Sequence, residues 1–371
     1  MSNHHQSSSP FCTVPFVTAF VNDQGFKDCC ARSNILSSPG QSFAHWWQDP
    51  RLVDFRKELD SFDTWPVGCD VCRIRENFDG TSSRLAQNQQ IPKLQHHEWP
   101  RNWHIAFGNI CNLGCWICSE RYSSVIQQHK VKARIPLSIQ YDPQKQFEQS
   151  WPTIKDQVLR SYEYHDEVTL TMLGGEPFVN DIVQEFLQEL LELNLGARTV
   201  LHWHTNATVD PSRTMQHRSL SPWRYVCMFL SLDAVGPYAE WLRYGTKWKE
   251  VEKNVNVLKA VADYTEIHCT VSVLNINQLT ELDQFARAHA VQLRLSTLTN
   301  PEFMNLACWD QSPDSLLITP TSEKFKIYYD LIGTAPVAGS SMLLKKHIRS
   351  FDKVRLPLAS FDPDFARRID W

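Results

Sequence analysis

The sequence predicts an α/β fold in which six strands alternate with helices along most of the chain. Two observations support this prediction: short runs of apolar or β-branched residues recur from about residue 103, and amphipathic helical stretches lie between them. Strands separated by helices pair in parallel through right-handed crossovers. The pattern leaves open whether the sheet is doubly wound and open or forms a partly closed barrel. In both cases the functional site belongs at the carboxyl ends of the strands.

The expected elements follow from these patterns. Strands are expected over residues 103–107, 167–173, 199–204, 225–232, 266–273 and 291–297. Helices are expected over residues 49–60, 181–194 and 249–264 and from Leu279 onward. Residues 131–165 are interpreted as an insertion before the second strand, and the alternation fades after about residue 298.

The chain is expected to divide into four parts. They are a disordered tail at 1–10, a cysteine-rich module with a linker at 11–100, the α/β region at 101–300 and a C-terminal extension at 301–371. The boundary is placed in residues 87–100, which are polar, rich in glutamine and interrupted by prolines, as linkers often are.

Composition limits the partners and the compartment. The 371 residues are 42% hydrophobic, enough for a large core, and a net charge of −4 gives no sign of an extended phosphate-binding surface, so nucleic acid is not an expected partner. We expect a cytoplasmic protein without a membrane partner, because no signal peptide or bilayer-length apolar run is present. Eight of the eleven cysteines precede residue 119, and in a reducing compartment such clusters indicate metal sites rather than disulfides.

Three cysteines follow the first expected strand of the α/β region: Cys111, Cys115 and Cys118. Their Cys-x3-Cys-x2-Cys spacing lets three thiolates face one iron-sulfur cube and leaves the fourth iron without a protein ligand. Structural zinc is the alternative, but a closed zinc site needs four ligands, and the nearest following His or Cys is His129. The spacing therefore favours a cluster with one open iron.

A glycine-rich turn follows the second expected strand, in the run Leu173-Gly174-Gly175-Glu176-Pro177. Two glycines let the backbone approach a ligand closely, and the adjacent carboxylate offers acceptors for an ammonium group. Alone, the same run is also typical of an ordinary turn between a strand and a helix. Its place one strand–helix unit after the cysteine triplet favours a binding role.

Together, the cysteine triplet and the turn resemble the signature of the radical S-adenosylmethionine superfamily. The resemblance implies a partial (β/α)6 TIM-like barrel, a [4Fe-4S] cluster on the triplet and a turn at Gly174, Gly175, Glu176 and Pro177 that receives the amino group of S-adenosylmethionine. It also implies cleavage to a 5'-deoxyadenosyl radical that abstracts a substrate hydrogen, with an electron donor such as flavodoxin or ferredoxin. Ile117 departs from the aromatic residue usual before the third cysteine, although Trp116 adjoins it.

Polar residues at the ends of later strands match the family more loosely. They are Asn206, Ser231, Asp233 and Asn275. At the mouth of a barrel such side chains could contact the ribose or the methionine carboxylate. The alternative is that they are helix caps and turn residues.

A second set of cysteines lies in the N-terminal module. Four of them could close a metal site: Cys12, Cys30, Cys69 and Cys72. The pattern resembles the first part of the twitch or SPASM-like auxiliary-cluster module, which implies a second [4Fe-4S] cluster, and Cys29 could replace Cys30 because adjacent side chains point apart. Zinc would use the same ligands and remains open.

Two further groups are weaker candidates. Cys308 follows the sixth strand and could act catalytically by donating a hydrogen atom to a substrate radical, although a free thiol near a loop has simpler explanations. His202 and His204 share one face of a strand, but no third metal ligand accompanies them.

The resemblance extends from Phe11 to about Leu306, and the ending Phe351–Arg355 also looks like that of twitch-containing members. It implies an enzyme that matures a ribosomal peptide by epimerisation, cross-linking or excision, with a small peptide-recognition protein as a partner. One alternative is a radical enzyme for a small molecule or nucleotide. Another is a non-catalytic iron-sulfur or zinc regulatory protein, which would have no use for an S-adenosylmethionine turn.

Overall fold

The computed structural model describes residues 10–30, 32, 36–38, 41–61, 64–90, 98–211, 222–316 and 323–369. The expected tail, apart from Pro10, and residues 91–97 of the expected linker lie outside these ranges. Within the ranges, no helix combines the length and the apolar character needed to cross a bilayer.

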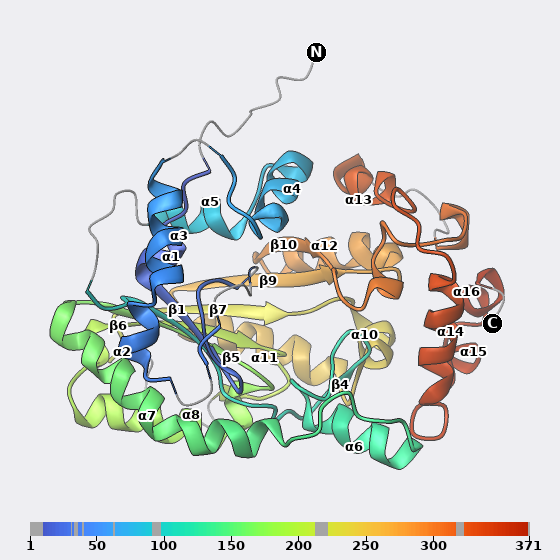
Figure 1. Ribbon diagram of the computed structural model, residues 1–371. Coiled ribbons are helices and arrows are strands. Elements are labelled where there is room, and N and C mark those ends of the chain that lie inside the picture. The colour runs from blue at the N-terminus through green and yellow to red at the C-terminus, as the bar shows by residue number, and fades with distance from the viewer. Residues whose placement is uncertain are drawn as a thin grey trace.

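Strands and helices alternate through the centre of the chain, and Figure 1 shows their arrangement. The strands are β1 Thr18–Asn22, β2 Gly25–Lys27, β3 Asn102–Ala106, β4 Gly114–Cys115, β5 Val168–Leu173, β6 Thr199–Thr205, β7 Tyr225–Ser231, β8 Arg243–Tyr244, β9 Tyr264–Val271 and β10 Gln292–Thr297. The helices are α1 Val14–Val17, α2 Phe43–Trp47, α3 Pro50–Ser61, α4 Asp70–Asp79, α5 Ser83–Gln90, α6 Ser124–Ala133, α7 Pro143–Tyr164, α8 Asp181–Glu192, α10 Gly236–Leu242, α11 Trp248–Val261, α12 Leu279–Ala288, α13 Lys326–Asp330, α14 Ser340–Ser350, α15 Leu358–Phe361 and α16 Pro363–Arg368.

One large sheet contains all six strands expected from the sequence. Its order is β10-β9-β7-β6-β5-β3-β1-β2, and every neighbouring pair is parallel except β1 with β2. From β3 to β10 the spatial order follows the chain order, so the sheet lacks the reversal that defines a doubly wound fold. Right-handed crossovers that all advance in one direction place their helices on one face, as in a partial barrel.

The two faces of this sheet have different chemistry. Along β6, Leu201 and Trp203 are fully buried on the face that carries the crossover helices, and the Trp203 ring lies 4.4 Å from that of Phe178. The alternate residues His202 and His204 point to the opposite face, which confirms that these two histidines share a face. The inner face of the sheet thus carries polar side chains such as His202 and His204 among apolar ones such as Phe229.

The expected insertion at 131–165 contains the missing crossover helix. Helix α7 connects β3 to β5, and its side chains Phe147, Ile154 and Val158 are buried. Polar residues and Pro152 interrupt its apolar stripe, which hides the helical period in the sequence. The segment is thus one of the regular strand–helix units.

Two strands of the N-terminal segment, β1 and β2, join the main sheet. β1 pairs in parallel with β3 and in antiparallel fashion with β2, so the expected boundary at 87–100 does not coincide with an edge of the sheet. Helices α4 and α5 lie over the inner face, opposite α7 and α8 (Figure 1). From α4, Arg75 donates to the carbonyl oxygen of Leu295 (2.7 Å) and to Ser296 Oγ (3.1 Å) on β10. The N-terminal segment therefore connects both edges of the six-strand set and covers its inner face.

Candidate active site

The cysteine triplet lies on the loop between β3 and α6, at the carboxyl end of the sheet. Cys115 pairs with Arg243 across β4 and β8, and the Cys118 N–H donates to the Cys115 carbonyl oxygen (3.1 Å). Ser123 fixes the far end of the loop, because its hydroxyl donates to the Leu113 carbonyl oxygen (2.7 Å) and accepts from the Ile126 N–H at the start of α6. The three thiols are thereby held on one short, well-anchored turn.

The glycine turn packs directly against this loop. Gly174 and Gly175 have φ values of 83° and 55°, in the left-handed region that favours glycine. A Cβ on Gly174 would lie 2.8 Å from the Gly108 carbonyl oxygen, and one on Gly175 would overlap the carbonyl group of Ile110. The glycines were expected to let a ligand approach closely. The structure shows another reason for glycine here: the turn packs against the backbone that leads into Cys111, and this contact leaves no room for a Cβ.

Glu176 links the glycine turn to the end of β6. Its side chain is fully buried, and its carboxylate accepts hydrogen bonds from Thr205 Oγ1 (2.9 Å) and from the N–H groups of Asn206 (2.7 Å) and Phe178 (3.2 Å). Burial raises the pKa of Glu176 to about 7, although these hydrogen bonds lower it. The side chain expected to accept an ammonium group is thus bonded within the chain, and Pro177 continues the turn as the first residue of a short 3-10 helix.

We expect Glu176→Gln to lower the free energy of unfolding by about 1–3 kcal/mol, because an amide NH2 would face a backbone N–H and leave a buried donor unsatisfied. Urea denaturation of the metal-free protein measures this. Glu281→Gln, on the exposed surface of α12, is the matched control and should change stability by less than about 0.5 kcal/mol. Equal effects from the two substitutions would contradict the structural role of Glu176.

A cavity of about 330 Å³ lies between the triplet and the glycine turn, and we call it the triplet cavity. Its lining includes Cys111, Cys115, Cys118, Gly174, Gly175, Asn206, Ser231 and Arg243. The structure thus brings seven of the residues expected to bind the cluster or S-adenosylmethionine to one cavity and adds Arg243. Asn206 is held there by hydrogen bonds to Glu176 and from its side-chain N–H to Asn112 Oδ1 (2.8 Å).

Asp233 and Asn275, expected as cofactor contacts, have other partners. The Asp233 carboxylate pairs with Arg243 (2.6 Å) and accepts from the Thr270 N–H (2.8 Å). Asn275 is fully buried, donates to the Asp233 carbonyl oxygen (3.0 Å) and accepts from the Ser272 N–H (2.7 Å). Both are bonded within the chain, and neither lines the triplet cavity. This agrees with the alternative that they are turn and capping residues.

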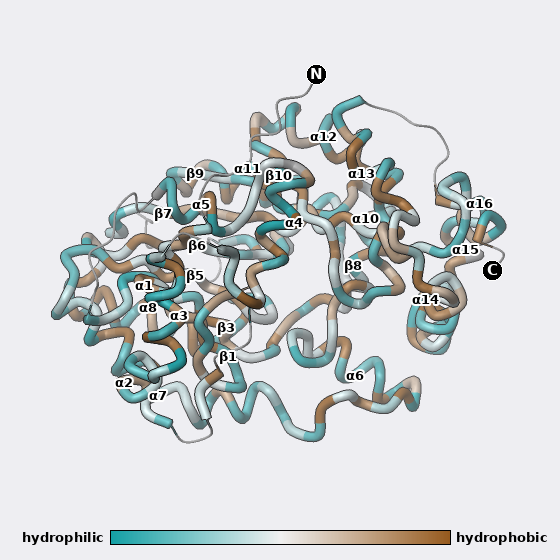
Figure 2. The backbone as a smooth tube through the Cα atoms, turned by 45° about the horizontal axis from the view of Figure 1, so that its top comes forward, coloured by the Kyte–Doolittle hydropathy of each residue, from teal (hydrophilic) through white to brown (hydrophobic). Residues whose placement is uncertain are grey.

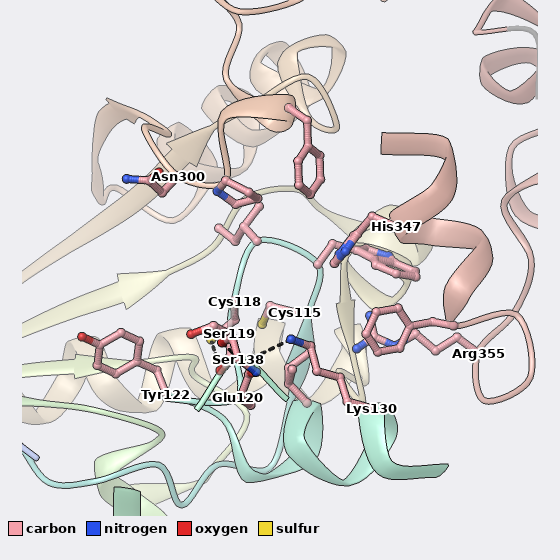
Figure 3. Close-up of a pocket in the computed structure, with 16 residues that line it drawn as sticks. Cys115, Cys118, Ser119, Glu120, Tyr122, Lys130, Ser138, Asn300, His347 and Arg355 are labelled. Carbon is pink, nitrogen blue, oxygen red and sulfur yellow. Dashed lines mark hydrogen bonds and ion pairs between the residues drawn. The ribbon is translucent and has the colours of Figure 1, made fainter. Parts of the chain in front are cut away.

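A second cavity, the outer cavity of about 570 Å³, lies on the other side of the cysteine loop, next to α6 and α14. Both views place α6 and α14 on the same side of the molecule, with β4 nearby in Figure 1 and β8 nearby in Figure 2. Figure 3 shows Cys115 and Cys118 on one side of this cavity and His347 and Arg355 on the other. The cysteine loop therefore separates two hollows.

The chemistry around the triplet fits an anionic metal cluster. Burial raises the pKa of all three thiols, that of Cys118 to about 12, so they would be protonated without a metal; metal coordination deprotonates a thiol. Two arginines lie beside the loop. The side chain of Arg243 is 12% exposed and its Nη1 is 3.7 Å from Cys115 Sγ, whereas Arg355 is buried and two of its side-chain nitrogens lack hydrogen-bond partners. Because Asp233 already pairs with Arg243, a negative charge at the triplet would balance the charge of Arg355.

The N-terminal cysteines also gather in one place. Burial raises the pKa of the Cys12 thiol, with smaller contributions from the nearby Cys29, Cys72 and Cys69, and a hydrogen bond with Cys29 raises the pKa of Cys30. Both Cys29 and Cys30 belong to the group, so the choice between them stays open. In the described part of the chain, no three or more His, Cys, Asp or Glu side chains are placed to hold a metal ion. Both cysteine sets remain predicted ligands.

A third hollow, which we call the inner chamber, has a volume of about 600 Å³ and lies between the inner face of the sheet and helices α4 and α5. Four histidines line it: His104, His202, His204 and His268. Burial lowers the pKa of His104 and His204 to about 3 and that of His202 to about 4, so these three rings are neutral at pH 7. Each neutral ring offers one hydrogen-bond donor and one acceptor.

The inner chamber connects the two cysteine sets. It shares Leu173 and His204 with the triplet cavity, and Cys30 lines it on the side of the N-terminal module. Glu266 and Arg294 are charged residues in the lining of the inner chamber. The Glu266 carboxylate accepts hydrogen bonds from His268 Nε2 (2.8 Å) and Arg294 Nε (3.1 Å). A polar molecule in this chamber would lie between the triplet and the N-terminal cysteines.

The sequence did not predict several of these residues, and one predicted residue, Cys308, lies away from the cavities. No sequence pattern indicated Arg243, because only the pairing of two-residue strands brings it to Cys115. Of the four histidines in the inner chamber, the sequence pattern indicated only His202 and His204. Cys308 lies in the C-terminal segment, where its carbonyl oxygen accepts from the Val337 N–H (3.0 Å), and it lines none of the three cavities. A catalytic role for Cys308 stays a prediction.

No protein-family model matches the chain, and no curated protein matches it. Three radical S-adenosylmethionine enzymes are among the similar solved structures. SuiB of Streptococcus suis bound to precursor peptide SuiA is 17% identical over 58% of this chain and 42% of that chain, with a TM-score of 0.35. The structure of anSMEcpe with bound AdoMet is 19% identical over 58% and 57%, with a TM-score of 0.40, and TYW1 with a lysine-pyruvate adduct is 14% identical over 67% and 81%, with a TM-score of 0.35. The chain thus spans about half the length of the first two.

Proposed function

We propose that this protein is a radical S-adenosylmethionine enzyme. The observation that carries the proposal is the triplet cavity, in which Cys111, Cys115 and Cys118 meet the backbone of Gly174 and Gly175 at the carboxyl end of a parallel sheet. Cys111, Cys115 and Cys118 would hold a [4Fe-4S] cluster, and the glycine turn with Asn206 and Ser231 would bind S-adenosylmethionine. When bound, these groups supply a one-electron cleavage to methionine and a 5'-deoxyadenosyl radical, which takes one hydrogen atom from the substrate.

The chain itself orients the reactants and excludes water. Glu176, held by Thr205 and Asn206, fixes the turn against the end of β6, so the cofactor-facing backbone is preorganised. Helices α4 and α5 cover the inner chamber, which adjoins the triplet cavity through Leu173 and His204. A substrate in the chamber would therefore present its C–H bond at the triplet cavity, away from solvent.

We further propose a peptide substrate from ribosomal peptide maturation. The inner chamber of about 600 Å³ falls in the range of ligand pockets, roughly 300–1,000 Å³, and its neutral imidazoles suit the N–H and C=O groups of a peptide backbone. The resemblance to twitch-containing maturases supports the same class. Epimerisation, cross-linking and excision are all compatible with this site.

The test is an anaerobic assay of the reconstituted, reduced protein with S-adenosylmethionine and a panel of precursor peptides. We expect 5'-deoxyadenosine and a modified peptide. Loss of a fragment, loss of two hydrogens or deuterium uptake from heavy water would identify excision, cross-linking or epimerisation. Cleavage stimulated only by small molecules would contradict the peptide class, and no cleavage at all would contradict the enzyme assignment.

A second cluster on the N-terminal cysteines predicts a specific iron content. Reconstituted wild-type protein is expected to hold about eight irons per chain, as two four-iron clusters require. The double variant Cys69→Ala, Cys72→Ala is expected to hold about half as much, because it removes two of the proposed ligands. Cys308→Ala, outside both sets, should keep the full content. Wild-type protein with half the iron plus bound zinc would contradict the second cluster.

A further inference from the structure

Arg355 follows α14 in the C-terminal segment, and its side chain reaches the cysteine loop. The guanidinium carbon lies 4.2 Å from the centre of the Trp116 ring, 4.5 Å from that of Phe351 and 5.4 Å from that of Tyr244. Only 6% of the residue is exposed, and it lines the outer cavity together with Cys115 and Cys118 (Figure 3). A permanently charged group is thus enclosed by aromatic rings beside the triplet.

The polar contacts of this guanidinium are incomplete. Its Nε donates to His129 Nδ1 (3.3 Å), whereas Nη1 and Nη2 are buried without a hydrogen-bond partner. Among the residues that the structure describes, no carboxylate forms an ion pair with Arg355, whereas Arg243, the other arginine at this loop, is paired with Asp233. A buried cation without an anion is unfavourable, because the aromatic rings repay only part of its desolvation cost.

The anion that Arg355 lacks would come from the triplet. Cys115 and Cys118 line the same cavity as Arg355, but neutral thiols cannot compensate the charge of its guanidinium. A cluster held by three thiolates carries net negative charge, and one-electron reduction adds to it. We infer that Arg355 is the counter-cation of the cluster at Cys111, Cys115 and Cys118 and that it selectively stabilises the reduced state. This inference rests on the proposed function.

The charge of Arg355 should act on the reduction potential. A nearby cation favours the more negative, reduced form, and the effect is large where protein rather than water surrounds the pair. Arg355 is a positioning residue in this sense, since it acts through the cluster and contacts no substrate in the proposed scheme. Two properties can be measured without turnover: the midpoint potential of the cluster and the stability gained on loading it.

The first experiment is a redox titration of the cluster-loaded protein, followed by electron paramagnetic resonance. Arg355→Met, which keeps much of the side-chain volume but removes the charge, is expected to move the midpoint to more negative potential. At a fixed potential the ratio of reduced to oxidised cluster should fall at least tenfold, which corresponds to 59 mV for one electron. Arg355→Lys should retain most of the wild-type ratio, and Arg349→Met, at an exposed position on α14, should leave it unchanged.

The second experiment compares melting temperatures with and without the cluster. In metal-free protein, Arg355→Met removes an uncompensated buried cation and is expected to leave the melting temperature unchanged or raise it. In cluster-loaded protein the same substitution removes an ion pair. The rise in melting temperature on cluster binding, the gain on loading, should therefore be smaller than in wild type. A residue that serves only packing would lower both melting temperatures equally, and that outcome would overturn the inference.

Failure of the inference and failure of the proposed function give different results. If wild-type protein takes up no cluster at the triplet, both are overturned. If it binds the cluster and cleaves S-adenosylmethionine, but Arg355→Met changes neither the midpoint potential nor the gain on loading, only the role of Arg355 is overturned.

Discussion

Gly175→Ala is expected to abolish cleavage of S-adenosylmethionine and to destabilise the protein by about 3 kcal/mol or more. The added Cβ would overlap the carbonyl group of Ile110, which belongs to the backbone that leads into Cys111. Backbone cannot rotate away as a flexible side chain can, so either the glycine turn or the cysteine loop must move. The positive φ of 55° adds strain for any side chain. Urea denaturation and a 5'-deoxyadenosine assay measure the two effects.

Gly80→Ala separates the overlap from the backbone conformation. Gly80 also has a positive φ, 73°, but nothing lies within 4 Å of its added Cβ. Gly80→Ala should lower the free energy of unfolding by about 1–2 kcal/mol, the strain of a left-handed backbone, and should leave cleavage of S-adenosylmethionine intact. Equal losses of stability in the two variants, with cleavage retained in both, would contradict the proposed fit between the turn and the cysteine loop.

Single alanine substitutions of Cys111, Cys115 and Cys118 are each expected to reduce 5'-deoxyadenosine formation to the level without enzyme. Each thiol is one of three proposed ligands, and burial holds its pKa so high that it ionises only with a metal. Loss of one ligand should prevent stable cluster binding, so the visible absorption of the cluster at this site should disappear as well.

Cys269→Ala is the matched control for the triplet. This thiol is more deeply buried than the triplet thiols, it lies in β9 outside the triplet cavity, and its sulfur accepts a hydrogen bond from Asn275 Nδ2 (3.5 Å). Its removal should cost a small amount of stability through a lost packing contact and leave cleavage in place. Cleavage that survives in a triplet variant would show that the electron enters S-adenosylmethionine elsewhere.

The sequence predicted the regular part of this fold well, because hydrophobic periodicity reports which residues face the core. All six expected strands lie within about two residues of their predicted positions, from β3 to β10. Helix α7 was mistaken for an insertion, because half of its surface faces solvent and Pro152 interrupts the apolar stripe. The covering role of α4 and α5 had no local signal at all, since it depends on contacts with distant strands.

The candidate site was predicted in part for the same reason. Cysteine spacing within one loop is a local property and can be read from sequence, as can a pair of glycines at the end of a strand. The roles of Asp233 and Asn275 depend on which side chains arrive beside them, and Arg243 in fact takes the Asp233 carboxylate. Arg355 reaches the loop from more than 200 positions away, which no spacing rule could indicate.

The hydrogen bonds from Arg75 to β10 have a consequence for the order in which the protein can become complete. Arg75 and its partners Leu295 and Ser296 are separated by 220 and 221 positions, so during synthesis from the N-terminus the covering helices emerge long before the strand that fastens them. Contacts between such distant residues form slowly, because a long loop must close first. Until β10 has been made, the inner chamber between the two cysteine sets is not closed. Any metal that the cysteines bind before that point is bound while they are exposed to solvent.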